Sequence, residues 1–309
     1  MVKENYHTPV MLSESIDALD IKPSGIYADV TFGGGGHSRA ILDRLAGDGK
    51  LFGFDQDPDA ENNSPDDNRF RLIRSNFRYL KHFLRYYDAI PVDGILADLG
   101  VSSYQFDQAG KGFSIRMKGP LDLRMNPELE ISASDIVHQY DAKRLEQLFK
   151  LYGEIHNARF LANLIVQERQ NQTLNTTDAF INAIDKAVLR KKENQYLAQV
   201  FQALRIEVND ELVALQEMLK QTPQLLKPGG RLVVLSYHSL EDRLVKNFTK
   251  SGNFNGNLEK DFYGNILSPF SLISRKPVKA SPEEIAMNNR ARSARLRIAE
   301  KKQDNGKEK

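Results

Sequence analysis

Apolar residues in the first hundred positions fall into four short runs, and a fifth run follows position 229. The runs are rich in Val, Ile, Leu and Phe, do not alternate with polar residues, and cover 25–32, 50–57, 69–77, 93–100 and 230–239. Such runs are typical of strands buried on both faces of a parallel sheet. Residues 37–49, between the first two runs, read as a helix that ends at glycine. The pattern predicts a doubly wound α/β sheet, whose ligands bind beyond the carboxyl ends of its strands.

The spacing changes between Asp98 and Arg231, where the chain is far longer than one crossover helix requires. Apolar residues recur there at helical spacing in 142–153, 157–169, 177–189 and 196–220. The last segment reads as one helix with an apolar stripe from Leu197 to Leu219. An inserted helical unit is therefore expected.

Two further strands, 268–278 and 293–300, are expected to add a hairpin-like pair to the sheet. The resulting division has a sheet domain in two parts (1–110 and 216–300), a helical insertion (111–215) and a disordered tail (301–309).

Cysteine is absent from the 309 residues. Disulfides, thiolate metal sites and a cysteine nucleophile are therefore excluded. No apolar run reaches the roughly 18 residues of a transmembrane helix, and the N-terminal residues lack the apolar stretch of a signal peptide. We expect a cytoplasmic protein that does not act at a membrane.

The net charge of +2 is unevenly distributed along the chain. Residues 275–309 contain 11 Lys and Arg against 5 Asp and Glu, so the rest of the chain is mildly acidic. A basic terminal arm favours a polyanionic partner, although a solvated tail explains the same charge.

TFGGGGHS, residues 31–38, places four glycines directly after the first predicted strand. Such a run indicates a tight strand-to-helix turn or the close approach of bare backbone to a ligand, and we favour the ligand. A P-loop is excluded because His37 stands where its phosphate-binding lysine belongs. A dinucleotide fingerprint would use Gly33 and Gly35, but Ser38 stands where its third glycine belongs. The remaining candidate is S-adenosylmethionine, which binds to the same kind of sheet.

Two residues that follow later strands suit this cofactor. Asp55 closes the second strand, where its carboxylate can accept both ribose hydroxyls, as it also could in an NAD site. Phe77 follows the third strand and can lie against an adenine face.

Five longer segments together identify a family: TFGGGGHS, DLGVSSYQFD (98–107), FQALRIEVNDEL, SYHSLEDRLVK and NNRARSARLRIAE. In this order they closely resemble the ribosomal RNA small subunit methyltransferase H family, and the similarity runs from HTPVML to RIAE. The resemblance implies a class I S-adenosylmethionine-dependent methyltransferase fold, a Rossmann-like doubly wound sheet with an inserted helical domain that recognises the substrate. It also implies methyl transfer to the exocyclic N4 of a cytidine in the decoding centre of 16S rRNA.

The resemblance further implies contacts with S-adenosylmethionine from the glycine loop, from strand ends and from the segment after the fourth strand. These residues are Gly35, Gly36, His37, Asp55, Phe77, Asp98 and Gln105, and we add Gly34 of the same loop. No metal site is expected.

The chemistry of cytosine supports the N4 position. Methylation of a ring carbon ordinarily begins with attack by a cysteine, which this chain lacks. Direct transfer to N4 needs an acceptor that holds the amine N–H groups beside the sulfonium. Asp98, at the end of the fourth strand, is the expected acceptor, with Ser102 and Ser103 shaping the pocket; a role as a helix cap or a cofactor ligand only is the alternative.

Contacts with RNA are expected from three further places. Arg205 and Asn209 lie at i and i+4 on the polar side of the last insertion helix, where ordinary surface polarity is the alternative. His238 follows the fifth strand and is expected to contact substrate. Arg290 and Arg292, together with the arginines that follow them, are expected to bind phosphates.

The target cytidine must leave its stack to reach the cofactor, so base extrusion is expected. The partner is 16S rRNA within the small ribosomal subunit or a late precursor, and the protein is expected to be a monomer or homodimer. Two alternatives remain: a nicotinamide-dependent oxidoreductase, and an RNA-binding ribosome assembly factor without turnover.

Overall fold

A computed structural model describes residues 9–102, 105–106, 108–188 and 190–303. The chain divides into two compact units, 1–100 with 213–309 and 101–212. The boundaries of these units differ from the predicted 110/111 and 215/216, and the functions assigned to the parts stay predictions. No helix among the described residues is long and apolar enough to cross a membrane.

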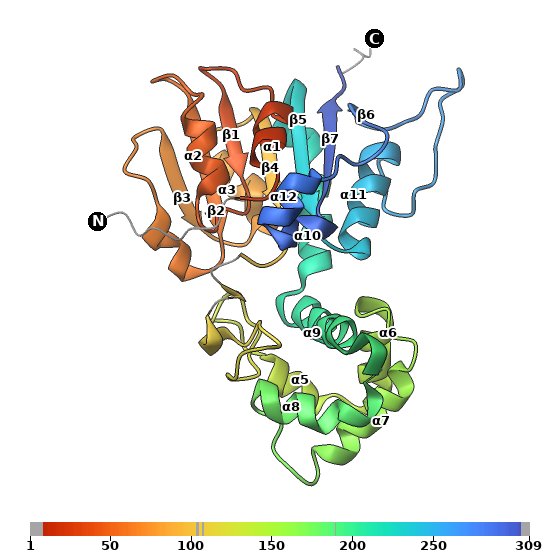
Figure 1. Cartoon of the computed structure of the whole chain (residues 1–309). Coiled ribbons are helices and arrows are strands. Elements are labelled where there is room, and N and C mark those ends of the chain that lie inside the picture. Colours follow the sequence, from red (N-terminus) through yellow and green to blue (C-terminus); the bar gives the residue numbers. More distant parts are fainter. Residues whose placement is uncertain (1–8, 103–104, 107, 189, 304–309) are drawn as a thin grey trace. The chain divides into compact units, whose positions relative to one another are not determined.

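The first unit contains a sheet, and within the described residues its seven strands lie in the order β3-β2-β1-β4-β5-β7-β6 (Figure 1). The strands are β1 (Ile26–Asp29), β2 (Lys50–Asp55), β3 (Phe70–Arg74), β4 (Val92–Asp98), β5 (Leu226–Ser236), β6 (Phe270–Leu272) and β7 (Arg295–Lys301). Neighbours among β1 to β5 pair in parallel, whereas β7 pairs antiparallel with both β5 and β6. The predicted parallel strands and the terminal pair are confirmed, and the fold is that of a class I methyltransferase.

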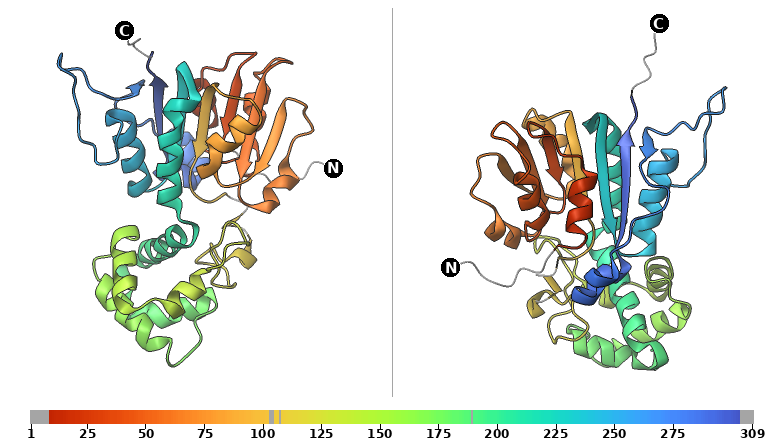
Figure 2. Two further views of the ribbon diagram at one scale, coloured as in Figure 1. Left: turned by 180° about the vertical axis from the view of Figure 1, so that it is seen from behind. Right: turned by 45° about the horizontal axis from the view of Figure 1, so that its top comes forward.

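Helices cover both faces of this sheet, as Figure 1 and the view from behind in Figure 2 show. They are α1 (Leu12–Ala18), α2 (Gly36–Leu42), α3 (Leu80–Tyr86), α10 (Glu211–Leu225), α11 (Ser239–Ser251) and α12 (Pro282–Met287). Consecutive strand residues alternate between two cores because strand side chains point to opposite faces. Ile95 packs with residues of α3, α10 and α11, whereas Leu96 packs with residues of α1 and α2. The sheet is therefore doubly wound, and its polar strand ends are left to form a site.

The second unit has a separate hydrophobic core. Its helices are α5 (Ala133–Gln139), α6 (Ala142–Tyr152), α7 (Ala158–Glu168), α8 (Thr177–Ile184) and α9 (Glu193–Asn209). Side chains cap the starts of several of them: Ser132 forms a capping box with Asp135 at α5, and Asp141 and Thr176 cap α6 and α8. The predicted helical insertion is thus present.

Two details differ from the sequence-based reading. The expected single helix over 196–220 is wrong, because α9 ends and α10 begins on either side of Asp210, which adopts the left-handed conformation at φ 51°. The expected tail from 301 also begins too early, because Lys301 is the last residue of β7; residues 304–309 lie outside the described part of the chain.

Candidate active site

The glycine loop connects β1 to α2, and its backbone requires glycine for reasons internal to the protein. Gly33 and Gly35 have positive φ angles of 51° and 74°. A Cβ atom on Gly35 would lie 2.9 Å from the Phe32 ring, and one on Gly36 would lie 2.1 Å from Cγ of Pro9. The tight turn that competed with a ligand in the sequence reading therefore accounts for these three glycines.

Side chains hold the loop in this conformation from outside. The Arg39 guanidinium donates to the carbonyl oxygen of Gly34 at 2.8 Å and to that of Asn63 at 2.9 Å. Asn63, at the end of the 3₁₀ helix Pro58–Asn63, donates its amide to the carbonyl oxygen of Gly33 at 3.0 Å. The loop is thus preformed at the carboxyl end of β1.

Asp55, the last residue of β2, faces this loop. Its Oδ2 accepts the Gly33 N–H at 2.7 Å, and its Oδ1 accepts the Asp57 N–H at 2.8 Å. Burial raises the pKa of Asp55 to about 6, although both backbone hydrogen bonds oppose the rise. Each carboxylate oxygen has a second lone pair, so Asp55 can still accept hydroxyl groups of a ribose.

Asp98, the last residue of β4, is a further acid of this site with a raised pKa. Its Oδ1 accepts the Tyr237 hydroxyl at 2.6 Å, and its Oδ2 lies 3.8 Å from Nδ1 of His37. Burial raises the pKa of Asp98 to about 7, and the charge of Glu241 adds to the rise, while the Tyr237 hydrogen bond opposes it. About 24% of the side chain is exposed, so a ligand can reach this carboxyl group.

Asp29 completes a set of acids, because β1, β2 and β4 all end in aspartate. The Asp29 carboxylate is buried, and it accepts the Ser38 hydroxyl at 2.7 Å and the Thr31 N–H at 3.2 Å. Thr31 in turn accepts the N–H of Asp98 on its hydroxyl at 2.6 Å. These bonds tie the glycine loop to the end of β4.

His37 is buried between two of these acids. Burial lowers its pKa, although the charge of Asp29 and a hydrogen bond with the Val10 backbone oppose the change, so the ring is neutral near pH 7. Its Nε2 atom is buried and has no hydrogen-bond partner among the described residues. Buried polar atoms without partners are uncommon, so this nitrogen is available to a ligand.

Phe77 begins a short 3₁₀ helix after β3 and is partly buried against the sheet core. The preceding Asn76 donates its amide to Gln56 Oε1 at 2.9 Å, which links the ends of β3 and β2. Phe77 and Asp55 are therefore brought to the same edge of the sheet.

Ser102 and Gln105 belong to the second unit and lie in one turn. The Ser102 N–H donates to Gln105 Oε1, and the Gln105 N–H donates to Ser102 Oγ, each at 3.2 Å. Gln105 is buried. Ser103 lies outside the described residues, and the roles of all three stay predictions.

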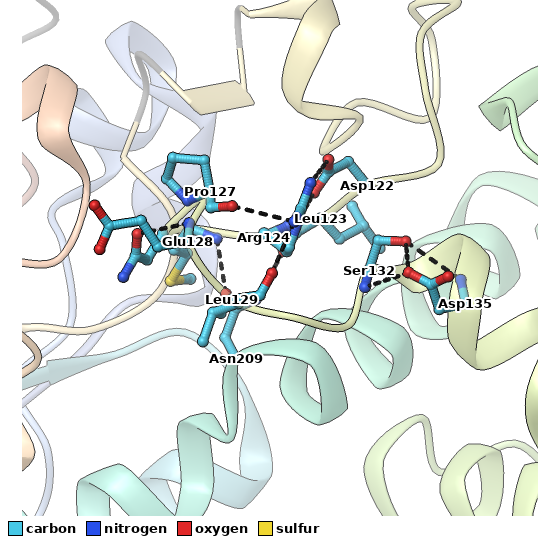
Figure 3. A network of polar contacts seen from close by, with 11 residues as sticks. Asp122, Leu123, Arg124, Pro127, Glu128, Leu129, Ser132, Asp135 and Asn209 are labelled. Atoms are coloured by element: carbon cyan, nitrogen blue, oxygen red, sulfur yellow. Dashed lines mark hydrogen bonds and ion pairs between the residues drawn. The ribbon is translucent and has the colours of Figure 1, made fainter.

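Asn209 is not on a polar surface, which corrects the sequence reading. The side chain is 4% exposed; its Oδ1 accepts the Met125 N–H at 2.7 Å, and its Nδ2 donates to the carbonyl oxygens of Leu123 at 2.8 Å and Arg205 at 2.9 Å. Figure 3 shows Asn209 against this loop, which Arg124 holds through further bonds. The amide has a structural task in the second unit.

Arg205 is likewise engaged within the second unit. Its guanidinium binds both carboxylate oxygens of Glu211 at 2.8 and 3.0 Å, and the two side chains are only 13% and 11% exposed. A role in RNA contact would have to compete with this bidentate pair.

His238 caps the start of α11. Its Nδ1 accepts the Glu241 N–H at 3.4 Å, while Glu241 Oε2 accepts the backbone N–H groups of Tyr237 and His238 at 2.9 and 3.3 Å. This capping box fixes the turn between β5 and α11. A contact between His238 and substrate stays a prediction.

The C-terminal arginines divide into two groups. Arg290 and Arg292 lie in the 3₁₀ helix Asn289–Ser293, and Arg292 is exposed. Arg295 and Arg297 lie on β7 and bind Asp242 of α11, at 3.0 Å from Arg295 and 2.6 Å from Arg297. Asp242 thus binds both arginines of the second group, while phosphate binding by Arg290 and Arg292 stays a prediction.

A family model for the MraW methylase family matches residues 4–302. The chain belongs to this family. It is 57% identical over 297 residues to the ribosomal RNA small subunit methyltransferase H of Parabacteroides distasonis, covering 96% of this chain and 97% of that one. The protein of the same name from Flavobacterium johnsoniae is 53% identical over 296 residues, covering 96% and 98%. As an MraW methylase, the protein is a methyltransferase that uses S-adenosylmethionine.

Solved structures resemble this MraW methylase only distantly. An rRNA methylase from Streptococcus thermophilus has a TM-score of 0.43 at 13% identity, covering 98% of this chain and 99% of that one. A methyltransferase from Streptococcus mutans in complex with SAH has a TM-score of 0.40 at 14% identity, covering 96% and 99%.

The residues at the strand ends fit S-adenosylmethionine. Acidic side chains end β1, β2 and β4, and an acidic site suits a sulfonium cation better than the pyrophosphate of a dinucleotide. Asp55 would hold the ribose, and the unpartnered nitrogen of His37 would bind a polar group of the methionyl end. This set argues against the nicotinamide alternative.

Sequence reasoning missed Asp29, Thr31 and Tyr237 as parts of the site. Thr31 opens the glycine motif and Asp29 precedes it by two positions, so their proximity was available as a signal. Tyr237 stands beside His238, which attracted attention because of its place after the fifth strand. The contact between Tyr237 and Asp98 joins residues 139 positions apart, and no local pattern reveals it.

Proposed function

We propose that this MraW methylase transfers the methyl group of S-adenosylmethionine to the exocyclic N4 of a cytidine in the decoding centre of 16S rRNA. The observation that carries the proposal is the partly exposed carboxyl group of Asp98 at the end of β4, beside the glycine loop. The names of the relatives, which specify small-subunit ribosomal RNA, support the substrate class.

Asp98 is the proposed catalytic residue. The lone pair of a cytosine amine is delocalised into the ring, so the amine is a poor nucleophile until an acceptor holds its N–H groups. Oδ2 of Asp98 is the free oxygen for this task, since Oδ1 accepts the Tyr237 hydroxyl. A carboxyl group whose pKa is raised to about 7 is also matched to accept a proton near neutral pH.

Bound S-adenosylmethionine supplies an activated methyl group. The protein orients the acceptor: the glycine loop, Asp55 and His37 hold one side of the site, and the bonds from Thr31 fix the end of β4. Methylation at a ring carbon by a cysteine-dependent route is excluded, because the chain contains no cysteine.

The substrate is proposed to be 16S rRNA in the small subunit or a late precursor, with the target base extruded from its stack. Arg290 and Arg292 would bind phosphate groups, and the helical insertion would recognise the surrounding RNA. The cytoplasm is the expected place of action, and a monomer or homodimer is expected.

The test is methyl transfer from tritiated S-adenosylmethionine to small ribosomal subunits by variants of β4. Asp98→Ala should lower kcat by about 100-fold or more, because it removes the acceptor. Asp93→Asn, at the other end of the same strand, is the matched control and should retain activity; Asp93 accepts the Ile26 N–H and the Lys227 ammonium far from the loop. Wild-type turnover by folded Asp98→Ala would remove Asp98 from catalysis.

A further inference from the structure

Tyr237 directly follows β5 and packs, partly buried, against the sheet core that contains Leu96. Its backbone N–H donates to Glu241 Oε2 at 2.9 Å, so the first turn of α11 fixes its main chain. The same helical turn is bound to the sheet, because Asp242 binds Arg297 of β7 at 2.6 Å. Gly100, with φ 98°, lies beside the ring, and a Cβ there would be in ordinary van der Waals contact with it, 3.5 Å from Cδ2 of Tyr237.

The hydroxyl of Tyr237 donates a hydrogen bond of 2.6 Å to Oδ1 of Asp98. The phenol is the donor, because burial and the charge of Asp98 raise the pKa of Tyr237 well above its usual value. Hydrogen bonds to a charged acceptor are among the stronger ones in proteins. Tyr237 therefore both orients the carboxyl plane and favours its ionised form.

We propose that Tyr237 is a positioning residue for methyl transfer: its hydroxyl occupies Oδ1 of Asp98, so that Oδ2 of the ionised carboxylate faces the nucleobase amine. This inference rests on the proposed function of Asp98. The SYHSLEDR segment would then contribute to the reaction through its tyrosine, while its histidine caps a helix.

Methyl transfer to the amine is a single displacement at the methyl carbon. The amine lone pair forms the new N–C bond while the C–S bond breaks. The electron pair of the C–S bond stays on sulfur, so the sulfonium becomes a neutral thioether. The methylated amine thereby gains a positive charge, which it loses by giving one N–H proton to Oδ2 of Asp98. Tyr237 keeps its own proton throughout, and Asp98 later releases the acquired proton to water.

Other charged groups around the pair act in known directions. Glu241 on α11 raises the pKa of Asp98, and Glu284 on α12 raises that of Tyr237. Asp29 at the end of β1 and Asp98 disfavour each other's charge, and His37 on α2 is neutral near pH 7 because burial lowers its pKa. Among these groups, the Tyr237 hydroxyl is the one that directly donates to Asp98.

The test is the pH dependence of kcat in Tyr237→Phe. Removing the donor should move the acid limb, where Asp98 becomes protonated, to higher pH by about one to two units. The loss of kcat should thus be large at pH 7 and small above pH 9, while KM for S-adenosylmethionine changes little. Replacement of Tyr237 by 3-fluorotyrosine, which keeps the shape and is a more acidic donor, should move the limb to lower pH.

Tyr27→Phe is the matched control. Tyr27 is also buried in the first unit, and its hydroxyl accepts the Lys22 N–H at 2.7 Å, remote from Asp98 along the chain. Its removal should leave the pH profile unchanged. A purely structural role for Tyr237 would lower activity equally at every pH, and this result would overturn the inference.

Two outcomes separate this inference from the proposed function. If Asp98→Ala loses activity but both Tyr237 replacements keep the wild-type acid limb, Tyr237 has no positioning role and Asp98 keeps its own. If Asp98→Ala turns over like the wild type, the proposed function of Asp98 fails first. An acid limb that shifts in opposite directions with phenylalanine and fluorotyrosine supports the inference.

Discussion

Asn209 offers a direct choice between a structural and an RNA-binding role, and Asn209→Ala is the perturbation that makes it. The variant removes the side-chain amide, whose oxygen accepts the Met125 N–H and whose nitrogen donates to the Leu123 carbonyl oxygen. Each of these two bonds joins residues at least 84 positions apart in the sequence. The structure predicts that the second unit loses stability, because this loop keeps its buried backbone groups but loses their partner.

The magnitude follows from the groups left unsatisfied. Each buried backbone group without a partner costs about 1–3 kcal/mol. Alanine recovers up to about 0.7 kcal/mol of helix propensity at the end of α9, and relaxation of the loop reduces the loss further. A net destabilisation of about 2–3 kcal/mol is expected, which corresponds to a shift of about 1 M in the urea midpoint for an m-value near 3 kcal/mol/M.

Circular dichroism at 222 nm is a suitable assay, since the second unit is mainly helical. The control is Gln202→Ala on the same helix: this amide is half-buried and donates to the Tyr152 carbonyl oxygen at 2.9 Å. It should cost less than about 1 kcal/mol. An Asn209→Ala protein with wild-type stability but weakened RNA binding would refute the structural assignment.

Three further outcomes are expected. Gly36→Ala should weaken binding of S-adenosylmethionine about tenfold or more in calorimetry, because the added Cβ would lie 2.1 Å from a proline ring. The control Gly47→Ala should bind the cofactor normally, because a Cβ at Gly47 would have no described atom within 4 Å. Arg292→Ala should weaken RNA binding and reduce the slope of log affinity against log salt concentration by about 1. Arg297→Ala should chiefly destabilise the fold, because the Arg297 guanidinium binds Asp242. Equal salt slopes for Arg292→Ala and the wild type would contradict phosphate contact. The kcat of the wild type should fall at acid pH as Asp98 is protonated. The midpoint should lie below the ligand-free pKa of Asp98, about 7, because the neighbouring sulfonium favours the carboxylate. A rate that stays constant down to about pH 5 would contradict a role of Asp98 as a base.

The sheet was predictable because each parallel strand is a compact apolar run with a polar end. Asp55 was proposed from this rule, and Asp98, which the family resemblance also implied, closes such a run as well. The break at Asp210 was not predictable, because the apolar stripe continues in helical phase from Val208 to Leu212 across it. Hydrophobic periodicity reports which face is buried and does not report a single residue in the left-handed conformation.

Polar residues were harder to place than apolar ones. Spacing on a helix put Arg205 and Asn209 on one side, but the loop at 123–125 buries Asn209, and Glu211 binds Arg205. Such contacts depend on segments that are distant in sequence. Tyr237 was missed for the same reason, whereas the glycines were found because their backbone constraint is local.

The identity of the methylated atom tests the account most directly. Small ribosomal subunits that lack the modification would be incubated with the protein and S-adenosylmethionine, and the rRNA digested to nucleosides for mass spectrometry. One methyl group on the N4 of a single cytidine of the decoding centre, absent when Asp98→Ala replaces the wild type, is the predicted result. A methyl group on a ring carbon or a ribose, or no transfer at all from the folded protein, would contradict the account.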